Sequence, residues 1–105
     1  MNNDYIVLTE EFLDWKWFNN AKTLSVFMFL LLHANTKAQY CRKDRIKRGS
    51  LTATNELIAE SCGITVQNVR TALANLEQTG DIRRERRNRY QIITIVNYER
   101  YKDDI

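Results

Sequence analysis

Two stretches of the chain carry apolar residues with the periodicity of helices. The first runs from about Ala21 to Thr36 and is apolar on nearly all sides. A helix of this kind is expected to lie buried on most of its faces, with a dimer interface on one face as the alternative. The second runs from Thr65 to about Thr79, and its apolar residues recur at a spacing of 3.6, at Val66, Val69, Leu73 and Leu76. It is predicted to be an amphipathic helix with one face toward the core.

Local signals for helix ends surround this second stretch. Thr54 precedes a short helix predicted over Asn55 to Ser61, and Thr65 precedes the amphipathic helix. A threonine hydroxyl at this position accepts a hydrogen bond from a backbone N–H that has no partner inside the helix. Gly63 and Gly80 follow the two helices, and glycine adopts the left-handed backbone that ends a helix. Two helices joined by a short glycine turn form a helix-turn-helix, here over about 54–79.

A hairpin is predicted directly after the helix-turn-helix. Its arms are Asp81 to Arg86 and Tyr90 to Val96, and the polar residues between them form the tip. The second arm is rich in β-branched side chains, which favour strands. The hairpin, over about 81–97, has the place of the wing in a winged helix. Upstream, Arg45 to Thr52 alternates enough to predict one more strand that leads into the helix-turn-helix.

The amino-terminal region is expected to form an extension of about 1–38. A short strand is predicted over Tyr5 to Leu8, followed by a helix from Glu10 to about Trp17 that Thr9 caps. At the other end, the tail from Asn97 to Ile105 is expected to add a last helical turn. With 105 residues, the chain is expected to be one domain. The predicted fold is mainly α with a small β-hairpin, of the α+β class: a winged helix-turn-helix with an amino-terminal helical extension.

The charge is concentrated although the net charge of +3 is modest. Ten of the sixteen basic residues lie in two runs, Arg42 to Arg48 and Arg83 to Arg89, and each run contains one acid. Solvated loops are the ordinary explanation of such runs. Because these two flank a helix-turn-helix, contact with DNA or RNA is the favoured explanation. The longest apolar run, Val26 to Leu32, is far shorter than the ~20 residues that a membrane span needs, so no membrane partner is expected.

The outer side of the amphipathic helix carries the side chains that suit base edges. Asparagine and glutamine pair with adenine through two hydrogen bonds, and arginine pairs with guanine in the same way. The cap at Thr65 also leaves backbone N–H groups turned outward, where they can meet a phosphate. The residues predicted to contact DNA from this helix are Thr65, Gln67, Asn68, Arg70, Thr71 and Asn75.

The wing and the strand before the helix-turn-helix supply the predicted backbone contacts. Arginine side chains make charge-assisted hydrogen bonds to phosphate and also enter minor grooves. The residues predicted here are Arg84, Arg86, Arg87 and Arg89 of the wing, and Lys47 and Arg48 of the basic strand.

The sequence carries no pattern typical of a catalytic, cofactor or metal site. His33 is the one histidine and is expected to be a core or interface residue of an apolar helix. Cys41 and Cys62 lack the spacing of metal ligands and are expected to be free thiols in a reducing compartment. We therefore expect a protein that is not an enzyme, with no cofactor and no metal.

Several segments together resemble the amino-terminal domain of DnaD-like replisome organisers from phages and bacteria. They are Phe12–Trp17, Leu30–Asn35, Lys47–Gly49, the helix beginning Thr65–Leu73 with Leu76 and Gly80, and Ile93–Tyr98. The resemblance implies a winged helix with an amino-terminal extension, origin DNA as the ligand, self-association, and a downstream domain that engages a helicase loader or helicase. This chain stops at Ile105 before any such domain, so it is expected to be either a fragment or a stand-alone module, and helicase recruitment is expected only for a longer chain.

The sequence thus predicts sequence-preferring binding of double-stranded DNA, in the initiation of phage or mobile-element replication. A transcriptional regulator built on the same winged helix is the alternative, and a protein-interaction or oligomerisation module that does not bind DNA is the alternative of another class. Single-stranded partners are less favoured because the aromatic residues are not interleaved with the wing arginines. The expected location is the cytoplasm of a bacterium or phage-infected host, at the nucleoid. A homodimer or higher self-association stays open.

Overall fold

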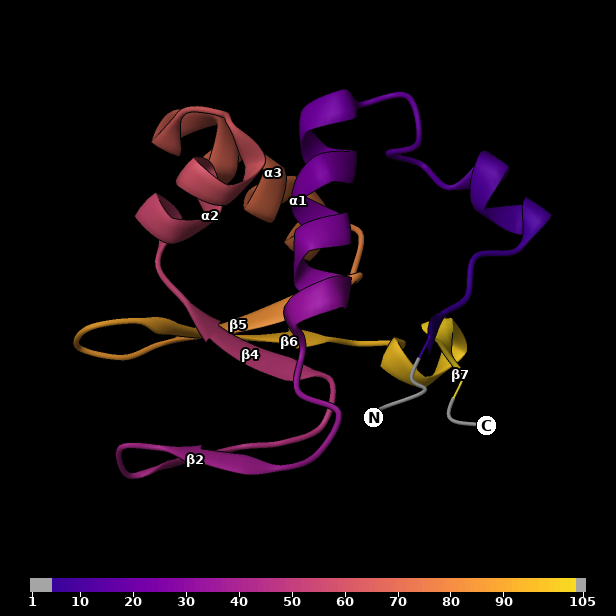
Figure 1. Ribbon diagram of the computed structural model, residues 1–105. Coiled ribbons are helices and arrows are strands. Elements are labelled where there is room, and N and C mark those ends of the chain that lie inside the picture. Colours follow the sequence, from indigo (N-terminus) through magenta and orange to yellow (C-terminus); the bar gives the residue numbers. More distant parts are fainter. Residues whose placement is uncertain (1–4, 104–105) are drawn as a thin grey trace.

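The computed structural model describes residues 5–103 and shows three α-helices stacked against one face of a three-stranded antiparallel sheet (Figure 1). The helices are α1 (Ala21–His33), α2 (Asn55–Cys62) and α3 (Val66–Gln78). The sheet strands are β4 (Ser50–Ala53), β5 (Ile82–Arg86) and β6 (Gln91–Ile95), with β6 in the middle. This is the winged helix-turn-helix of the α+β class that the sequence predicts.

The helix-turn-helix forms where its capping residues place it. The Thr54 hydroxyl accepts a hydrogen bond from the backbone N–H of Leu57 at 3.1 Å. Thr65 accepts one from the backbone N–H of Asn68 at 3.0 Å, and the Asn68 side chain accepts one in return from the Thr65 N–H at 3.3 Å. Gly63, between the helices, has a φ of +69°. The predicted caps and the predicted glycine turn are therefore confirmed.

The predicted wing is also confirmed, as the hairpin β5–β6. Ile82 pairs with Ile95 at its base, and Arg86 pairs with Gln91 next to the tip. β4 pairs with the other edge of β6, so the wing is continuous with the strand that leads into α2.

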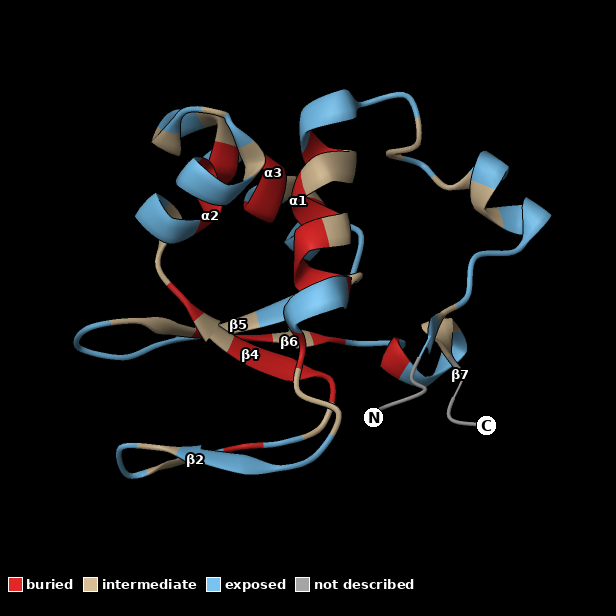
Figure 2. Ribbon diagram, viewed as in Figure 1, coloured by how far each residue is buried: buried red, intermediate tan, exposed pale blue. Residues whose placement is uncertain are grey.

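The core lies between the helices and the sheet (Figure 2). α1 crosses α3, and the two helices bury their apolar faces against each other. The largest side chains without solvent exposure include Phe27, Leu30, Leu73, Leu76 and Ile93. As expected, α1 is buried on most faces, although Leu32 is 68% exposed.

The amino-terminal extension differs from the prediction. A 3-10 helix, η1 (Glu10–Asp14), replaces the expected helix, and Thr9 makes no side-chain cap. The reason is tertiary, because the aromatic side chains of this segment are held by the body of the domain. The ring of Trp15 lies 4.8 Å from that of Phe27, and its indole N–H donates to Asp81 at 3.1 Å.

The first and last strands of the described part of the chain pair with each other. Strand β1 (Tyr5–Ile6), which is shorter than predicted, pairs with β7 (Lys102–Asp103). The predicted last helical turn is present as the 3-10 helix η2 (Tyr98–Tyr101). The first four residues of the predicted extension and the last two of the predicted tail lie outside the described residues.

The segment between α1 and β4 is a hairpin that the sequence analysis did not predict. α1 ends at His33 rather than Thr36, and β2 (Gln39–Cys41) then pairs with β3 (Asp44–Ile46). The single strand predicted over Arg45 to Thr52 is split because Gly49 adopts a φ of +81°. A Cβ atom added at Gly49 would lie 2.9 Å from Tyr98, so glycine also allows the close approach of η2.

Candidate nucleic-acid interface

The exposed side of α3 is polar, and three of the predicted contact residues lie on it. Gln67, Arg70 and Thr71 are exposed, and the Arg70 guanidinium lies 3.5 Å from the Gln67 side-chain oxygen. The opposite side of the helix packs into the core through Val69 and Leu73. The geometry therefore presents the first two turns of α3 to solvent on one side.

The other three predicted residues of α3 are engaged within the protein. The side chains of Thr65 and Asn68 each accept a hydrogen bond from the other residue's backbone N–H at the start of the helix. Asn75 is half-buried, and its amide donates to the Thr23 hydroxyl of α1 at 3.1 Å. Position 75 lies two turns after position 68, so both side chains are on the flank of α3 that turns away from its exposed side.

The opposite flank of α3 is joined to the wing. The guanidinium of Arg84, on β5, lies 2.9 Å from a carboxylate oxygen of Glu77, near the end of α3. Arg70 precedes Glu77 by seven residues, which is about two helical turns, so it lies on the same flank. The wing is also bound to the start of α2, because the Gln91 amide donates to Asn55 at 2.7 Å. These contacts hold the wing beside α3 and α2.

The wing arginines fall into two groups. Arg84 and Arg87 are paired with acids: their side chains are 22% and 37% exposed, and Arg87 lies 2.9 Å from Asp44. Arg86 and Arg89 are exposed and have no acidic partner within residues 5–103. The tip of the wing therefore carries two guanidinium groups that are available to an anion, and two that are engaged in holding the structure together.

The two predicted residues of the basic strand also differ from each other. Lys47 is exposed. Arg48 forms an ion pair with Glu99 at 2.7 Å, donates to the carbonyl oxygen of Thr36 at 2.9 Å and lies over the ring of Tyr98. The hydrogen bond from Arg48 lowers the pKa of Glu99. Arg48 thus connects η2 to the loop after α1, and this structural role was not visible in the sequence.

A hydrogen-bonded cluster links the wing to the β2–β3 hairpin. The Tyr90 hydroxyl donates to Asp44 at 2.7 Å and to the Cys41 carbonyl at 3.2 Å, while Arg87 donates to the other Asp44 oxygen at 2.9 Å. The Tyr90 hydroxyl, and then the Arg87 guanidinium, hold the pKa of Asp44 below its usual value. The same contact with the Asp44 carboxylate raises the pKa of Tyr90.

This cluster gives a prediction for acid pH. A carboxyl whose pKa is lowered by folding contributes stability above its unfolded pKa, and that stability is lost as the pH falls through the lowered value. An NMR titration of the side-chain carboxyl carbons should therefore show Asp44 titrating below the usual range of an aspartate. Tyr90→Phe should raise the pKa of Asp44 because it removes the main donor, whereas Tyr40→Phe, at a 75% exposed tyrosine on the same hairpin, should leave it unchanged. An ordinary pKa for Asp44 in all three proteins would contradict this cluster.

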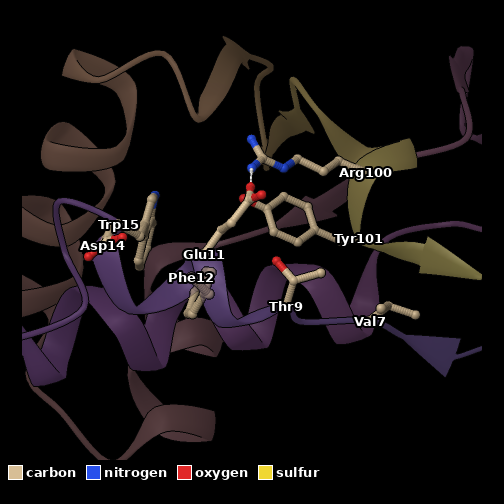
Figure 3. A pocket seen from close by; sticks show the side chains of 8 residues that line it. All are labelled: Val7, Thr9, Glu11, Phe12, Asp14, Trp15, Arg100 and Tyr101. Carbon is tan, nitrogen blue, oxygen red and sulfur yellow. Dashed lines mark hydrogen bonds and ion pairs between the residues drawn. The ribbon is translucent and has the colours of Figure 1, made fainter.

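A cleft of about 400 Å³ separates the extension from η2 (Figure 3). Glu11 and Arg100 point toward each other across it and form an ion pair at 2.8 Å. Phe12 and Tyr101 contribute rings to its walls. Thr9 and Asp14 also line the cleft.

The residues with metal-binding or redox chemistry are dispersed. No group of three or more His, Cys, Asp or Glu side chains comes together within the described residues. Cys41 and Cys62 are half-buried free thiols. For His33, the expected core position is wrong, because the residue lies exposed at the end of α1 with its ring stacked on Phe29, and the expected interface position stays a prediction. Within the described part of the chain, no helix has the length and apolar character of a membrane span.

Comparison with known proteins assigns the fold to a DNA-binding family. Residues 26–102 match the family described as Crp-like helix-turn-helix domain, from the middle of α1 to β7. The match covers both helices of the helix-turn-helix and the whole wing, and leaves out most of the extension. It gives no sign of a DnaD-like protein or of another replication protein. Searches of curated proteins and of solved structures found no match. The chain therefore belongs to the Crp-like helix-turn-helix domain family.

Proposed function

We propose that this protein binds double-stranded DNA with a sequence preference and acts as a transcriptional regulator. The observation that carries the proposal is the exposed polar side of α3, with Gln67 and Arg70, beside a wing on which Arg86 and Arg89 are exposed and meet no acid in the described part of the chain. The family of the domain supports DNA as the partner and transcription as the process. The family of the domain thus favours transcriptional regulation, the alternative that the sequence offers, over replication initiation.

In the proposed complex, the first two turns of α3 enter the major groove. Arg70 suits the two acceptors of a guanine, Gln67 suits an adenine, and Thr71 suits a thymine methyl group or a single acceptor. The backbone N–H groups at the start of α3 turn toward a phosphate. Asn75 is left out of this set because its amide is bonded to α1.

The wing supplies affinity in the same complex. Arg86 and Arg89 bind phosphates or enter the minor groove beside α3, where arginine is attracted by the negative potential. Arg84 and Arg87 hold the wing in position through Glu77 and Asp44. Lys47 adds a phosphate contact. Arg48 has a structural part instead, because its ion pair with Glu99 connects η2 to the loop after α1.

Two other functions remain as candidates. Replication initiation is favoured by the aromatic extension, which the family match leaves out and which resembles that of DnaD-like proteins; a helicase loader or helicase would then be a partner of a longer chain. A protein-interaction module that self-associates without DNA is the third candidate. Either DNA-binding role places the protein with the nucleoid in the cytoplasm.

Selection of bound fragments from genomic DNA of the source organism tests the proposal. The purified protein should enrich fragments that share one short motif and lie upstream of genes. Arg70→Ala should relax the preference at one base pair by about 1–3 kcal/mol, or roughly five- to 150-fold, because the variant loses a two-bonded contact to that base. Arg100→Ala, on η2, should keep the preference.

The competing outcomes of the selection are distinct. Enrichment of a replication origin in place of promoters would favour replication initiation. If the selection enriches no motif, and Arg70→Ala enriches the same fragments as the unchanged protein, sequence-preferring binding is rejected.

A further inference from the structure

The β2–β3 hairpin carries a second group of exposed basic side chains. Arg42 and Lys43 form its turn, Arg45 follows on β3, and all three are exposed. None of them has an acidic partner within residues 5–103. The one acid of this hairpin, Asp44, is bound to Arg87 of the wing. No acid in the described part of the chain therefore pairs with the positive charge of the turn.

The hairpin is fixed against the wing, so its charge has a definite position. Asp44 accepts hydrogen bonds from Arg87 and Tyr90, and the backbone carbonyl of Cys41 accepts a second bond from Tyr90. The two hairpins point in the same direction, toward the left in Figure 1. An open cleft of about 310 Å³ lies between their tips, lined by Arg42, Lys43, Asp44, Arg87, Asn88, Arg89 and Tyr90.

This arrangement concentrates like charges at one end of the molecule. Arg42 and Lys43 on one tip and Arg89 on the other line the same cleft. Groups of the same charge that line one cleft repel each other, so the free protein carries an electrostatic cost that a polyanion would remove. The two turns carry long basic side chains, which suit a phosphate backbone. The aromatic residues nearby, Tyr40 and Tyr90, lie on the arms of the hairpins, and the Tyr90 hydroxyl is bonded to Asp44.

We propose that the β2–β3 hairpin is a second DNA-binding wing, which holds the phosphate backbone next to the segment held by β5–β6. The inference rests on the proposed function, since it extends the same DNA complex. Duplex DNA presents one phosphate charge per roughly 1.7 Å of its axis, so two neighbouring tips meet phosphates that lie close together. Asp44 and Tyr90 set the distance between the two tips.

The test compares three variants of the full chain in binding to a mixed-sequence duplex of thirty base pairs, by fluorescence anisotropy over a range of salt. The hairpin variant is Arg42→Gln with Lys43→Gln, and the wing variant is Arg86→Gln with Arg89→Gln. The control, Lys16→Gln with Arg100→Gln, removes the same charge from the extension and η2, at the other end of the molecule (Figure 1). A further single variant, Arg45→Gln, leaves the turn unchanged, and circular dichroism verifies that each protein is folded.

Affinity falls as salt rises, and each lost phosphate contact makes the slope of log affinity against log salt less steep by about 0.9. In the hairpin variant, the slope of log affinity against log salt should therefore be less steep by about 2. Its affinity at ~0.1 M salt should be roughly ten- to sixty-fold lower. Arg45→Gln should lose up to about eightfold on the same basis. The control should bind as the unchanged protein does.

The outcomes separate this inference from the proposed function. Loss of affinity and slope in both the hairpin and the wing variants supports a second wing. If the wing variant binds weakly while the hairpin variant and Arg45→Gln bind like the control, the second wing is rejected and the proposed function stands. If neither the wing nor the hairpin variant loses affinity, the proposed function fails and the second wing fails with it.

Discussion

Phe27→Ala is expected to lower the free energy of unfolding by about 3–5 kcal/mol, the cost of removing a large aromatic ring from a packed core. Phe27 has no solvent exposure, and its ring lies against Trp15 at 4.8 Å and Tyr101 at 5.5 Å between ring centroids. The variant therefore opens a cavity where α1, the extension and η2 meet. Domains of this size have a total stability of about 5–15 kcal/mol, so the loss is a large part of the whole.

Urea denaturation followed by circular dichroism measures this loss. Leu32→Ala is the matched control on the same helix, because Leu32 is largely exposed and should change the free energy of unfolding by less than about 0.5 kcal/mol. Equal effects at the two positions would show that the extension does not pack on α1 as the structure has it.

Removal of three arginines from the proposed DNA face is expected to give the largest effect on binding. The variant combines Arg70→Gln, Arg86→Gln and Arg89→Gln. Affinity for duplex DNA should fall by roughly two to three orders of magnitude at ~0.1 M salt, because three phosphate or base contacts are lost. The slope of log affinity against log salt should become less steep by about 3. Folding should be retained because all three side chains are exposed.

A control variant removes the same charge elsewhere, with Lys16→Gln, Arg100→Gln and Lys102→Gln. These residues lie before α1 and on η2 and β7, at the opposite end of the molecule from the tip of the wing (Figure 1). Electrophoretic mobility shift over a salt series compares the two proteins. A similar loss in both would mean that net charge alone attracts DNA, and that α3 and the wing have no special part.

The helix-turn-helix was predictable because its signals are local. Thr54 and Thr65 lie beside the backbone groups that they cap, and Gly63 supplies a left-handed residue at the turn between them. The apolar stripe of α3 then sets which side faces the core. Signals of this kind act over a few residues, so one sequence is enough to recognise them.

Two features that were not predicted, the form of the extension and the orientation of Asn75, depend on distant partners. The extension forms a 3-10 helix because Trp15 and Trp17 bond to Asp81 and Thr79, more than sixty residues away. Asn75 turns from the predicted DNA face because Thr23 of α1 accepts its amide hydrogen. No local pattern distinguishes such a residue from its exposed neighbours.

The same reason explains why a run of arginines could not be sorted by sequence. Arg84, Arg87 and Arg48 pair with acids seven, forty-three and fifty-one residues away, and Arg87 also pairs with Glu85, two residues away. Arg86 and Arg89 meet no acid in the described part of the chain. A variant that removes Arg84 and Arg87 would disturb the position of the wing as well as its charge. Arg86 and Arg89 are therefore the better residues for a test of DNA contact.

The central claim is that the exposed side of α3 and the tip of the wing bind one duplex together. Amide chemical-shift mapping by NMR tests it most directly, with labelled protein titrated with a short duplex. We expect the largest shifts at residues 65–71 and 86–89 in a single titration step, with little change at 10–18 and 98–103. Shifts confined to the extension and η2, with α3 and the wing unchanged at saturating DNA, would contradict it.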